Sequence, residues 1–357
     1  MRVLTVVGNR PQFIKAAAVS HRLRAVADEV LVHTGQHYDA DLSEVFFAEL
    51  GLPAPEHRLA LGGGSNTAQT ARMLAGLEPL LAAEAPDLVL VYGDTNSTLA
   101  GALTAVQAGL PVAHVEAGMR SYDRAMPEEV NRVLTDHLAT LLLCSSQRAA
   151  ANLRREAVHG EAVVVGDVMV DVALLLGPRA RADTAALAAA GVEPGSYVLV
   201  TAHRAGNVDY PGRLARLVAL LEALPAPVVL PLHPRTRRRL EAAGLLGRLA
   251  AVPGLRLEAP LGYLAFTSLL HHARAVLTDS GGVQKEAYLA GVPCVTLRDT
   301  TEWTETVEAG WNTLVDLDAD AAVAVLATPA PAARPPLYGD GRAGERVVAA
   351  LTRRMAA

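Results

Sequence analysis

The chain has 357 residues, 51% hydrophobic and 19% charged, so it is long enough for two hydrophobic cores and too apolar for long disordered stretches. A net charge of -5, without a dense run of Lys or Arg, excludes a nucleic-acid partner. No apolar run has the length of a membrane span or a signal peptide, so we expect a cytoplasmic protein with no membrane partner.

Short apolar runs recur through the first half of the chain. Each run is followed by a turn and by a segment with helical periodicity. This alternation is typical of βαβ units, and it predicts a parallel sheet with helices on both faces. The predicted strands lie at residues 3–7, 30–33, 88–92, 112–115, 141–144 and 162–165.

The same rhythm restarts in the second half, after an interruption at residues 168–190. Further strands are predicted at residues 198–201, 228–230, 255–257, 275–277 and 294–296. We therefore expect an α/β protein with two Rossmann-like, doubly wound parallel-sheet domains. The expected N-terminal domain covers residues 1–170 and the C-terminal domain residues 171–340. A last helix, from about Ala343 within residues 341–357, would return to the first domain.

Positive charge gathers at the first strand-to-helix junction. Arg10 and Lys15 lie where a helix begins near Pro11, just after a glycine that permits a tight turn. Phosphate groups bind at such helix N-termini, because backbone N–H groups point out of them. The junction is a candidate phosphate site, and an ordinary turn with surface cations is the alternative.

Three carboxylates at strand and helix ends are candidates for acid–base chemistry. Asp94 follows a predicted strand and, taken alone, fits a helix N-cap better than a catalytic role. Glu128 and Arg132 are four residues apart on a helix, a spacing that an exposed ion pair would also explain. Glu116 ends a buried parallel strand, where an exposed ion pair would not account for a carboxylate.

The segment at residues 278–287 is the most specific single signal. A strand leads through Ser280, Gly281 and Gly282 into a helix, so backbone N–H groups and the helix dipole can meet a diphosphate. Glu286, one turn into that helix, could reach a ribose hydroxyl. This junction predicts a nucleotide site in the second half.

Three further polar residues directly follow predicted strands of the second half: His203, His233 and Arg298. Ligands of open α/β sheets bind at the carboxyl ends of the strands, which makes these side chains candidates as well. Taken singly, each histidine at such a place is more often a structural residue than a catalytic one.

The patterns of metal and nicotinamide sites are missing from the sequence. Cys144 and Cys294 have no His or Cys at metal-ligand spacing. The first strand is not followed by G-x-G-x-x-G, and neither Lys15 nor Lys285 has a Tyr four residues before it. We expect an enzyme with no metal and no cofactor.

Eight segments in order resemble the non-hydrolysing UDP-N-acetylglucosamine 2-epimerase family. They are GNRPQFIK, VYGDTNST, HVEAGMRS, MPEEVNRVLTDH, TAHR, PLHPRT, TDSGGVQKEA and LRDTTEW. The resemblance covers the chain from residue 1 to the YGDG segment and final helix. It implies the GT-B fold, in which two Rossmann-like domains flank a cleft and the C-terminal one mainly holds the nucleotide.

The resemblance also implies a two-step isomerase reaction on a UDP-sugar. UDP leaves by anti elimination to give a 2-acetamidoglucal, then re-adds with protonation on the other face. By motif match, Asp94, Glu116 and Glu128 are the unranked acid/base candidates. The motif match assigns to the sugar and diphosphate Arg10, Lys15, Arg132 and His203. It assigns to the nucleotide His233, Ser280, Gly281, Gly282 and Glu286. A homodimer is the family expectation.

The sequence departs from the family pattern at several positions. Gln12 stands where many members have Glu, and Gly206 replaces an acidic residue. The segment at residues 36–39 lacks the Arg-x-Met of members regulated by a second UDP-GlcNAc. Variants at residues 36–39, 126–137 and 301–303 resemble enzymes acting on UDP-2,3-diacetamido-2,3-dideoxyglucuronate. That substrate, a hydrolysing epimerase, a GT-B glycosyltransferase and a nucleotide-sugar binding module stay open as alternatives.

Overall fold

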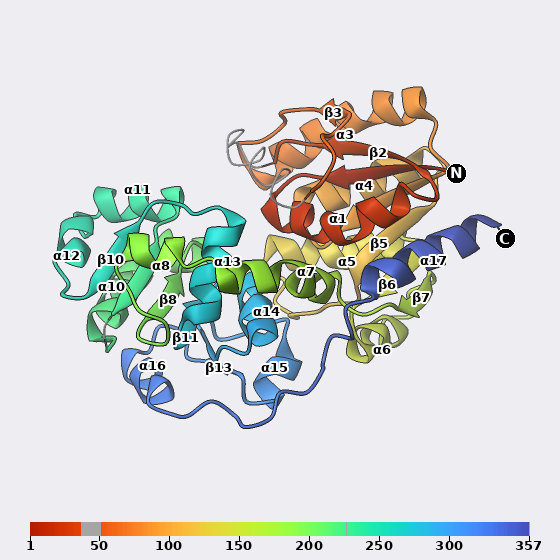
Figure 1. Cartoon of the computed structure of the whole chain (residues 1–357). Helices are drawn as coiled ribbons and strands as arrows, with labels where there is room; N and C mark the ends of the chain where they lie inside the picture. Colours follow the sequence, from red (N-terminus) through yellow and green to blue (C-terminus); the bar gives the residue numbers. More distant parts are fainter. Residues whose placement is uncertain (37–50, 226, 357) are drawn as a thin grey trace. The chain divides into compact units, whose positions relative to one another are not determined.

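The computed structural model describes residues 1–36, 51–225 and 227–356. The chain forms two compact units. Unit 1 contains Met1–Leu174 and Tyr338–Ala357, and unit 2 contains Leu175–Leu337 (Figure 1). Among the described residues, no helix is both long enough and apolar enough to span a membrane.

Unit 1 is built on a seven-stranded parallel sheet with the order β3-β2-β1-β4-β5-β6-β7. Its strands are β1 (Arg2–Val7), β2 (Asp28–His33), β3 (His57–Arg58), β4 (Leu88–Tyr92), β5 (Val112–Ala117), β6 (Leu141–Cys144) and β7 (Glu161–Val164). Every residue of the central strand β4 is buried, as expected for a strand that helices cover on both faces.

The helices of unit 1 follow the strands in alternation. They are α1 (Arg10–Leu23), α3 (Asn66–Glu84), α4 (Asn96–Gln107), α5 (Pro127–Leu138) and α6 (Gln147–Arg155). α7 (Val168–Ala182) begins in unit 1 and ends in unit 2. The last helix, α17 (Ala343–Ala356), begins where the sequence predicts it.

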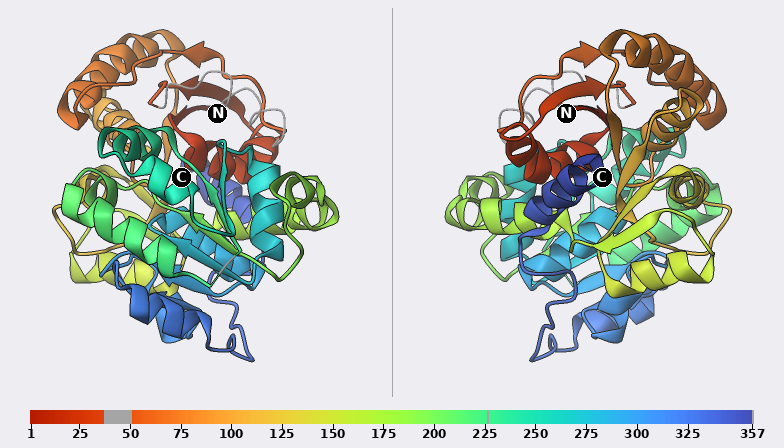
Figure 2. Two further views of the ribbon diagram at one scale, coloured as in Figure 1. Left: turned by 90° about the vertical axis from the view of Figure 1, so that its left-hand side faces the viewer. Right: turned by 90° about the vertical axis from the view of Figure 1, so that its right-hand side faces the viewer.

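α17 packs against α1 within unit 1, as the two views of Figure 2 show. The approach is close, because a Cβ added at Gly344 would lie 2.2 Å from the carbonyl oxygen of Ala18. The carboxylate of Asp171 accepts the N–H groups of Ala343 and Gly344, each at 2.9 Å. The first turn of α17 is therefore fixed by a buried acceptor.

Unit 2 contains a six-stranded parallel sheet with the order β10-β9-β8-β11-β12-β13. Its strands are β8 (Val198–Thr201), β9 (Val228–Pro231), β10 (Leu255–Glu258), β11 (Ala275–Thr278), β12 (Cys294–Thr296) and β13 (Asn312–Leu314). Its helices are α8 (Ala185–Ala190), α9 (Ala205–Val208), α10 (Pro211–Ala223), α11 (Pro234–Ala242), α12 (Leu246–Ala250), α13 (Tyr263–His272), α14 (Gly281–Ala290), α15 (Thr304–Glu308) and α16 (Ala319–Leu326).

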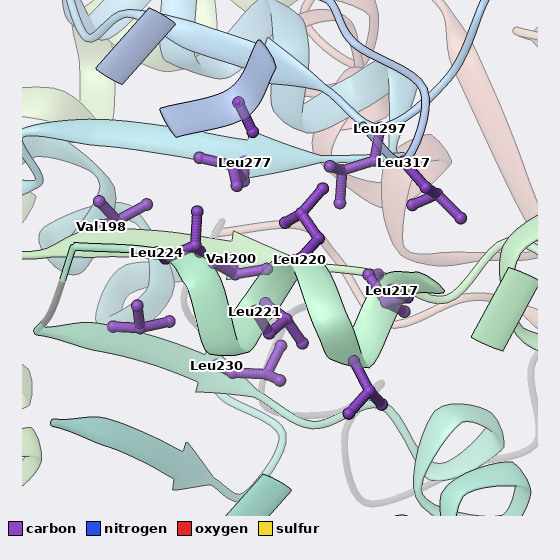
Figure 3. Packing of buried hydrophobic residues seen from close by; sticks show 14 of the residues in the cluster. Val198, Val200, Leu217, Leu220, Leu221, Leu224, Leu230, Leu277, Leu297 and Leu317 are labelled. Atoms are coloured by element: carbon purple, nitrogen blue, oxygen red, sulfur yellow. The ribbon is translucent and has the colours of Figure 1, made fainter. Parts of the chain in front are cut away.

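The core of unit 2 lies on both faces of this sheet. On one face, Leu217, Leu220 and Leu221 of α10 belong to a cluster with Val200 and Leu277 (Figure 3). A second cluster on other strand residues contains Tyr197 and Phe266 among its members. Burial of each large apolar side chain contributes about 1.5–3 kcal/mol.

The predicted fold class of two doubly wound parallel sheets is confirmed. Each predicted strand is present within one or two residues of its expected bounds. Sequence reasoning missed β3 and β13, which contain only two and three residues. His37, Tyr38 and Asp39, part of the segment singled out in the sequence, lie outside the described residues.

Candidate active site

The β1–α1 junction is fixed to the end of β4. The side chain of Asn9 caps α1 by accepting the N–H of Gln12 at 3.2 Å. The buried amide of Gln12 accepts the N–H of Gly8 at 2.7 Å and donates to the carbonyl of Tyr92 at 2.8 Å. A Cβ at Gly8 would lie 2.0 Å from Oγ of Ser97, so only glycine fits there.

Lys15 and Glu116 form a largely buried ion pair at this edge of the sheet. Their side chains are 12% and 5% exposed. Gly93, just past β4, packs against the pair, since a Cβ there would lie 3.0 Å from Nζ of Lys15 and 3.3 Å from Oε2 of Glu116. α1, β4 and β5 therefore bring one cation and one carboxylate together.

The backbone of Glu116 is strained. Its φ is +74°, and the register between β5 and β6 shifts between Val115 and Ala117. Such a non-glycine conformation costs about 1–3 kcal/mol and persists only when its surroundings hold it. β-bulges of this kind re-aim side chains and are frequent next to active sites. Glu116 is the candidate acid–base residue with the clearest structural mark.

Asp94 forms an ion pair with Arg132, whose side chain is 2% exposed. The interpretation of Asp94 as a helix cap is wrong, because Thr95 caps α4 by accepting the N–H of Thr98. Arg132 also pairs with Glu129 at 2.7 Å, so the interpretation of Arg132 as part of an exposed ion pair is wrong as well. A buried guanidinium must keep its carboxylate partners.

Glu129 is a buried carboxylate that sequence reasoning missed. It accepts the N–H groups of Ser121 and Tyr122, each at 2.9 Å, besides its bond from Arg132. The sequence does contain a sign of this buried carboxylate. The spacing of residues 129, 132 and 136 places three charged side chains on one face of α5.

Two further predicted residues lie at the starts of helices in unit 1. Arg10 is the first residue of α1 and Glu128 the second residue of α5, and both are half-buried. Because each helix follows a parallel strand, both residues lie at the carboxyl edge of the sheet. Unit 1 thus collects all six of its predicted site residues at one edge.

In unit 2, a buried carboxylate shapes the turn after β8. Asp279 accepts the backbone N–H groups of His203 and Arg204 at 3.0 Å, and the amide of Asn207 at 3.1 Å. The imidazole of His203 is 38% exposed and stacks on His233, with ring centroids 5.2 Å apart. The side chain of His203 is thus partly exposed just past β8.

His233 has a structural task, because its Nδ1 accepts the N–H of Arg235 at 3.1 Å and caps α11. Because Nδ1 is the acceptor of that bond, Nε2 carries the proton of the neutral ring. The predicted structural role of His233 is thus confirmed, and its assignment to the nucleotide stays a prediction.

The β11–α14 junction presents the start of a helix. Ser280 is the N-cap of α14, and its own N–H donates to Oγ1 of Thr278 at 2.9 Å. A Cβ at Gly281 would lie 1.9 Å from Oε1 of Glu302, whereas the nearest atom to one at Gly282 is 3.9 Å away. The first N–H groups of a helix lack intrahelical acceptors, which suits an anion.

Glu302 and Arg298 lie beside this helix start and form an ion pair at 3.0 Å. Both side chains are more than nine-tenths buried. Glu286 is half-buried on α14, one turn further along. The predicted residues Ser280, Gly281, Glu286 and Arg298 thus lie on or after neighbouring strands β11 and β12.

Lys285 is 1% exposed, and its ammonium lies 4.2 Å from the ring centroid of Trp303. Such a cation–π contact contributes about 2 kcal/mol when the pair is desolvated. Both lysines of the chain therefore lie in buried polar contacts next to candidate site residues.

The two cysteines, Cys144 and Cys294, are buried and not disulfide-bonded. Burial raises the pKa of each thiol to about 12, so neither is a thiolate nucleophile at neutral pH. Across the described ranges, the His, Cys, Asp and Glu side chains form no group of three that could hold a metal ion.

A family model described as UDP-N-acetylglucosamine 2-epimerase matches residues 21–352. The chain belongs to this family. The predicted GT-B fold and the predicted isomerase class are thereby confirmed. Sequence relatives and a solved structure agree with the assignment.

Two relatives match almost end to end. The chain is 44% identical to a UDP-N-acetylglucosamine 2-epimerase homolog of Methanococcus maripaludis, over 98% of this chain and 99% of the relative. It is 45% identical to the UDP-2,3-diacetamido-2,3-dideoxy-D-glucuronate 2-epimerase of Pseudomonas aeruginosa, over 99% of this chain and 100% of the relative. The names of similar proteins thus divide between two UDP-sugars.

The crystal structure of UDP-GlcNAc 2-epimerase from Methanocaldococcus jannaschii, in complex with UDP-GlcNAc and UDP, is similar over 99% of this chain and 100% of that one. The TM-score is 0.93 at 40% identity. The two-sheet architecture described above is therefore the architecture of a UDP-sugar epimerase.

Proposed function

We propose that this enzyme is a non-hydrolysing UDP-N-acetylglucosamine 2-epimerase that interconverts UDP-GlcNAc and UDP-ManNAc. The observation that carries the proposal is the strained Glu116 carboxylate, ion-paired with Lys15. The Asp94–Arg132 pair lies at the same sheet edge. Elimination chemistry needs this combination, because a proton must be removed while negative charge builds on a leaving group.

The reaction begins by breaking the C2–H bond, whose proton passes to a carboxylate. The C2 hydrogen is weakly acidic, so positive character at C1 must assist its removal. The C1–O bond breaks, its electron pair leaves with UDP, and a C1–C2 double bond forms. Re-addition of UDP with protonation of the opposite face of C2 gives the epimer. Asp94, Glu116 and Glu128 are the carboxylates assigned to these proton transfers.

The cationic side chains serve the sugar and the leaving diphosphate. In unit 1 these are Arg10, Lys15 and Arg132. In unit 2, His203, whose side chain is 38% exposed, is assigned to the same groups. Fixed positive charge at the leaving group stabilises the transition state more than the ground state, which is what raises kcat.

Unit 2 is assigned to UDP. The start of α14 offers the N–H groups of Gly281 and Gly282 and the hydroxyl of Ser280 to the diphosphate, and Glu286 can accept a hydrogen bond from a ribose hydroxyl. His233 and Arg298 complete the proposed nucleotide set. We place the enzyme in the cytoplasm as a homodimer without a cofactor, and light scattering of the purified protein checks the dimer.

The alternative substrate is UDP-2,3-diacetamido-2,3-dideoxyglucuronate. Two observations favour it: the 45% identity to the Pseudomonas aeruginosa enzyme and the Thr301-Glu302-Trp303 segment. The elimination chemistry is the same for both sugars. Steady-state kinetics with each UDP-sugar separates them, because kcat/KM for the true substrate will exceed that for the other.

Proton NMR of UDP-GlcNAc incubated with the enzyme in deuterium oxide tests the proposal. We expect UDP-ManNAc together with deuterium at C2 and no free hexosamine. Free hexosamine formed at the rate of turnover would instead identify a hydrolysing epimerase. Unchanged, undeuterated UDP-GlcNAc, with turnover of the diacetamido-uronate sugar, would shift the proposal to the alternative substrate. Turnover of neither sugar would favour a glycosyltransferase or a binding module.

A further inference from the structure

The strained conformation of Glu116 requires a restraint, and one carboxylate on α5 supplies it. Asp136 is fully buried and accepts three hydrogen bonds. Its donors are Nδ1 of His114 at 2.7 Å, the backbone N–H of Gly118 at 3.1 Å and the guanidinium of Arg120 at 2.7 Å. Three charge-assisted bonds to one buried acceptor make a rigid node.

The first two donors lie two residues before and two residues after Glu116. The carboxylate of Asp136 therefore binds a residue on each side of Glu116, at the β-bulge. The peptide at Gly118 cannot swing away without leaving a buried N–H group unpaired, which costs about 1–3 kcal/mol. That cost is comparable with the strain at Glu116, about 1–3 kcal/mol, so the node can hold the positive φ in place.

The hydrogen bonds around Asp136 also extend to Gly93, which packs against the Lys15–Glu116 ion pair. Nε2 of His114 lies 2.7 Å from the carbonyl oxygen of Gly93. Gly93 is the residue that packs against both members of the pair. Through the His114 ring, Asp136 thus fixes the turn after β4 relative to the bulge at the end of β5.

Asp136 is ionised in this setting. Burial by itself would raise the pKa of its carboxyl, but His114 and Arg120 hold that pKa below its usual value. Arg120 is in turn bound to Glu156 at 2.7 Å, so its guanidinium is neutralised from both sides. The carboxylate of Asp136 therefore stays a hydrogen-bond acceptor at neutral pH.

We propose that Asp136 is a positioning residue for the epimerase reaction, which holds the backbone of Glu116 in the conformation that directs its carboxylate to Lys15. The role rests on the proposed function of Glu116 as an acid–base group. Without the node, residue 116 can relax to a negative φ and carry its carboxylate away. A displacement of about 1 Å in a catalytic group can cost about 100-fold in rate.

Asp136→Ala and Asp136→Asn test the proposal as a pair. We expect kcat of D136A to fall about 100-fold, with KM and the dissociation constant of UDP within about threefold of wild type. Asn can accept from Gly118 and Arg120 with its amide oxygen and donate to Nδ1 of His114 with its NH2. D136N should therefore recover kcat to within about tenfold of wild type. If D136A does not fold, Asp136→Ser replaces it. Its hydroxyl keeps a polar group at this buried place but cannot accept from all three donors.

Asp171→Ala is the matched control. Asp171 is another buried carboxylate of unit 1 that accepts two backbone N–H groups, those of Ala343 and Gly344, but it serves α17 rather than the sheet edge. Both alanine variants should lose thermal stability. Only D136A should lose kcat per folded molecule, because a merely structural carboxylate does not act on Glu116.

Wild-type kcat in folded D136A would overturn the proposal, as would equal kcat losses in D136A and D171A. A D136N enzyme as slow as D136A would also contradict it, because that variant keeps the hydrogen bonds. Glu116→Gln separates this failure from that of the proposed function. A fully active E116Q enzyme, or an inactive wild type, would refute the acid–base role of Glu116 itself.

Discussion

The two units use the same strand order for different purposes. In each sheet, the first six strands of the unit are arranged in the order third, second, first, fourth, fifth, sixth. At the carboxyl edge of unit 1 the candidate functional groups are charged side chains, paired as Lys15–Glu116 and Asp94–Arg132. At the corresponding edge of unit 2 they are backbone N–H groups at the start of α14, together with stacked imidazoles.

The two edges also differ in backbone strain. Ser280, the N-cap of α14, has an ordinary φ of -86°, since a helix start presents its N–H groups without distortion. Glu116 has a φ of +74°, at the point where the register between β5 and β6 shifts. The candidate nucleotide edge of unit 2 thus begins with an ordinary helix start, whereas the candidate acid–base edge of unit 1 includes one strained carboxylate.

The comparison predicts that charge in unit 1 governs kcat. Glu116→Gln keeps the size of the side chain but removes the proton acceptor, and it leaves Lys15 without its carboxylate. We expect kcat to fall about 100-fold to 10,000-fold, the range for loss of a general acid or base. The dissociation constant of UDP, measured by calorimetry, should change little, because the nucleotide is assigned to unit 2.

Glu345→Gln is the control for this variant. Glu345 is also a carboxylate of unit 1, but it is 54% exposed and pairs with Arg342 at the surface. Its substitution should leave kcat unchanged, since exposed ion pairs contribute little. An E116Q enzyme with normal kcat but weak UDP binding would break the assignment of charge to chemistry.

A second prediction concerns the backbone site of unit 2. An alanine Cβ at Gly281 would lie 1.9 Å from Oε1 of Glu302, which Arg298 holds in place at 3.0 Å. Gly281→Ala must displace that buried carboxylate and distort the start of α14. We expect the dissociation constant of UDP to rise about tenfold, or roughly 1.4 kcal/mol, with a smaller change in kcat at saturating substrate.

Gly212→Ala gives the matched comparison in the same unit. Gly212 lies in α10, and an added Cβ there meets no atom within 4 Å. UDP binding should be unaffected, and thermal stability should stay equal or rise, because Ala favours helix over Gly by up to about 1 kcal/mol. Equal UDP affinities in G281A and G212A would remove α14 from the proposed diphosphate site.

The strands were predictable from sequence because parallel strands buried on both faces are continuous apolar runs. β4 is the clearest case, with five buried residues in Leu88–Tyr92. β3 and β13 were not predictable, because two or three residues at a sheet edge, such as His57–Arg58, have no period to detect.

The places of the candidate site residues at strand ends were predictable, but the partners of their side chains were not. Nothing in the spacing of Asp94, Thr95 and Arg132 indicates that Thr95 caps α4 and leaves Asp94 for Arg132. The node at Asp136 and the bulge at Glu116 depend on contacts between β5 and α5, which only the folded chain brings together.

A last difference between the units lies in the surroundings of two histidines, the buried His114 and the half-buried His271. His114 of unit 1 faces the carboxylate of Asp136. His271 of unit 2, on α13, accepts a hydrogen bond from Arg181 at 3.3 Å. Burial, and then the positive charges of Arg181, His272 and Arg334, lower the pKa of His271 to about 4. Its imidazole is therefore neutral in the folded protein at neutral pH.

This predicts a modest acid sensitivity in unit 2. Above about pH 6.5, His271 is neutral in both folded and unfolded chains and costs nothing. Between pH 6.5 and about 4, the unfolded chain binds a proton that the folded chain refuses, so stability falls as the pH falls. Allowing for the partial exposure of the ring, we expect the free energy of unfolding to fall by about 1 kcal/mol by pH 5.

Thermal unfolding of His271→Gln at pH 7.5 and pH 5 tests this prediction. The unfolding temperature of H271Q should change less between the two pH values than that of wild type. His159→Gln, at an exposed position, should follow wild type. Identical changes in unfolding temperature between the two pH values in all three proteins would show that burial and the nearby cations do not lower the pKa of His271.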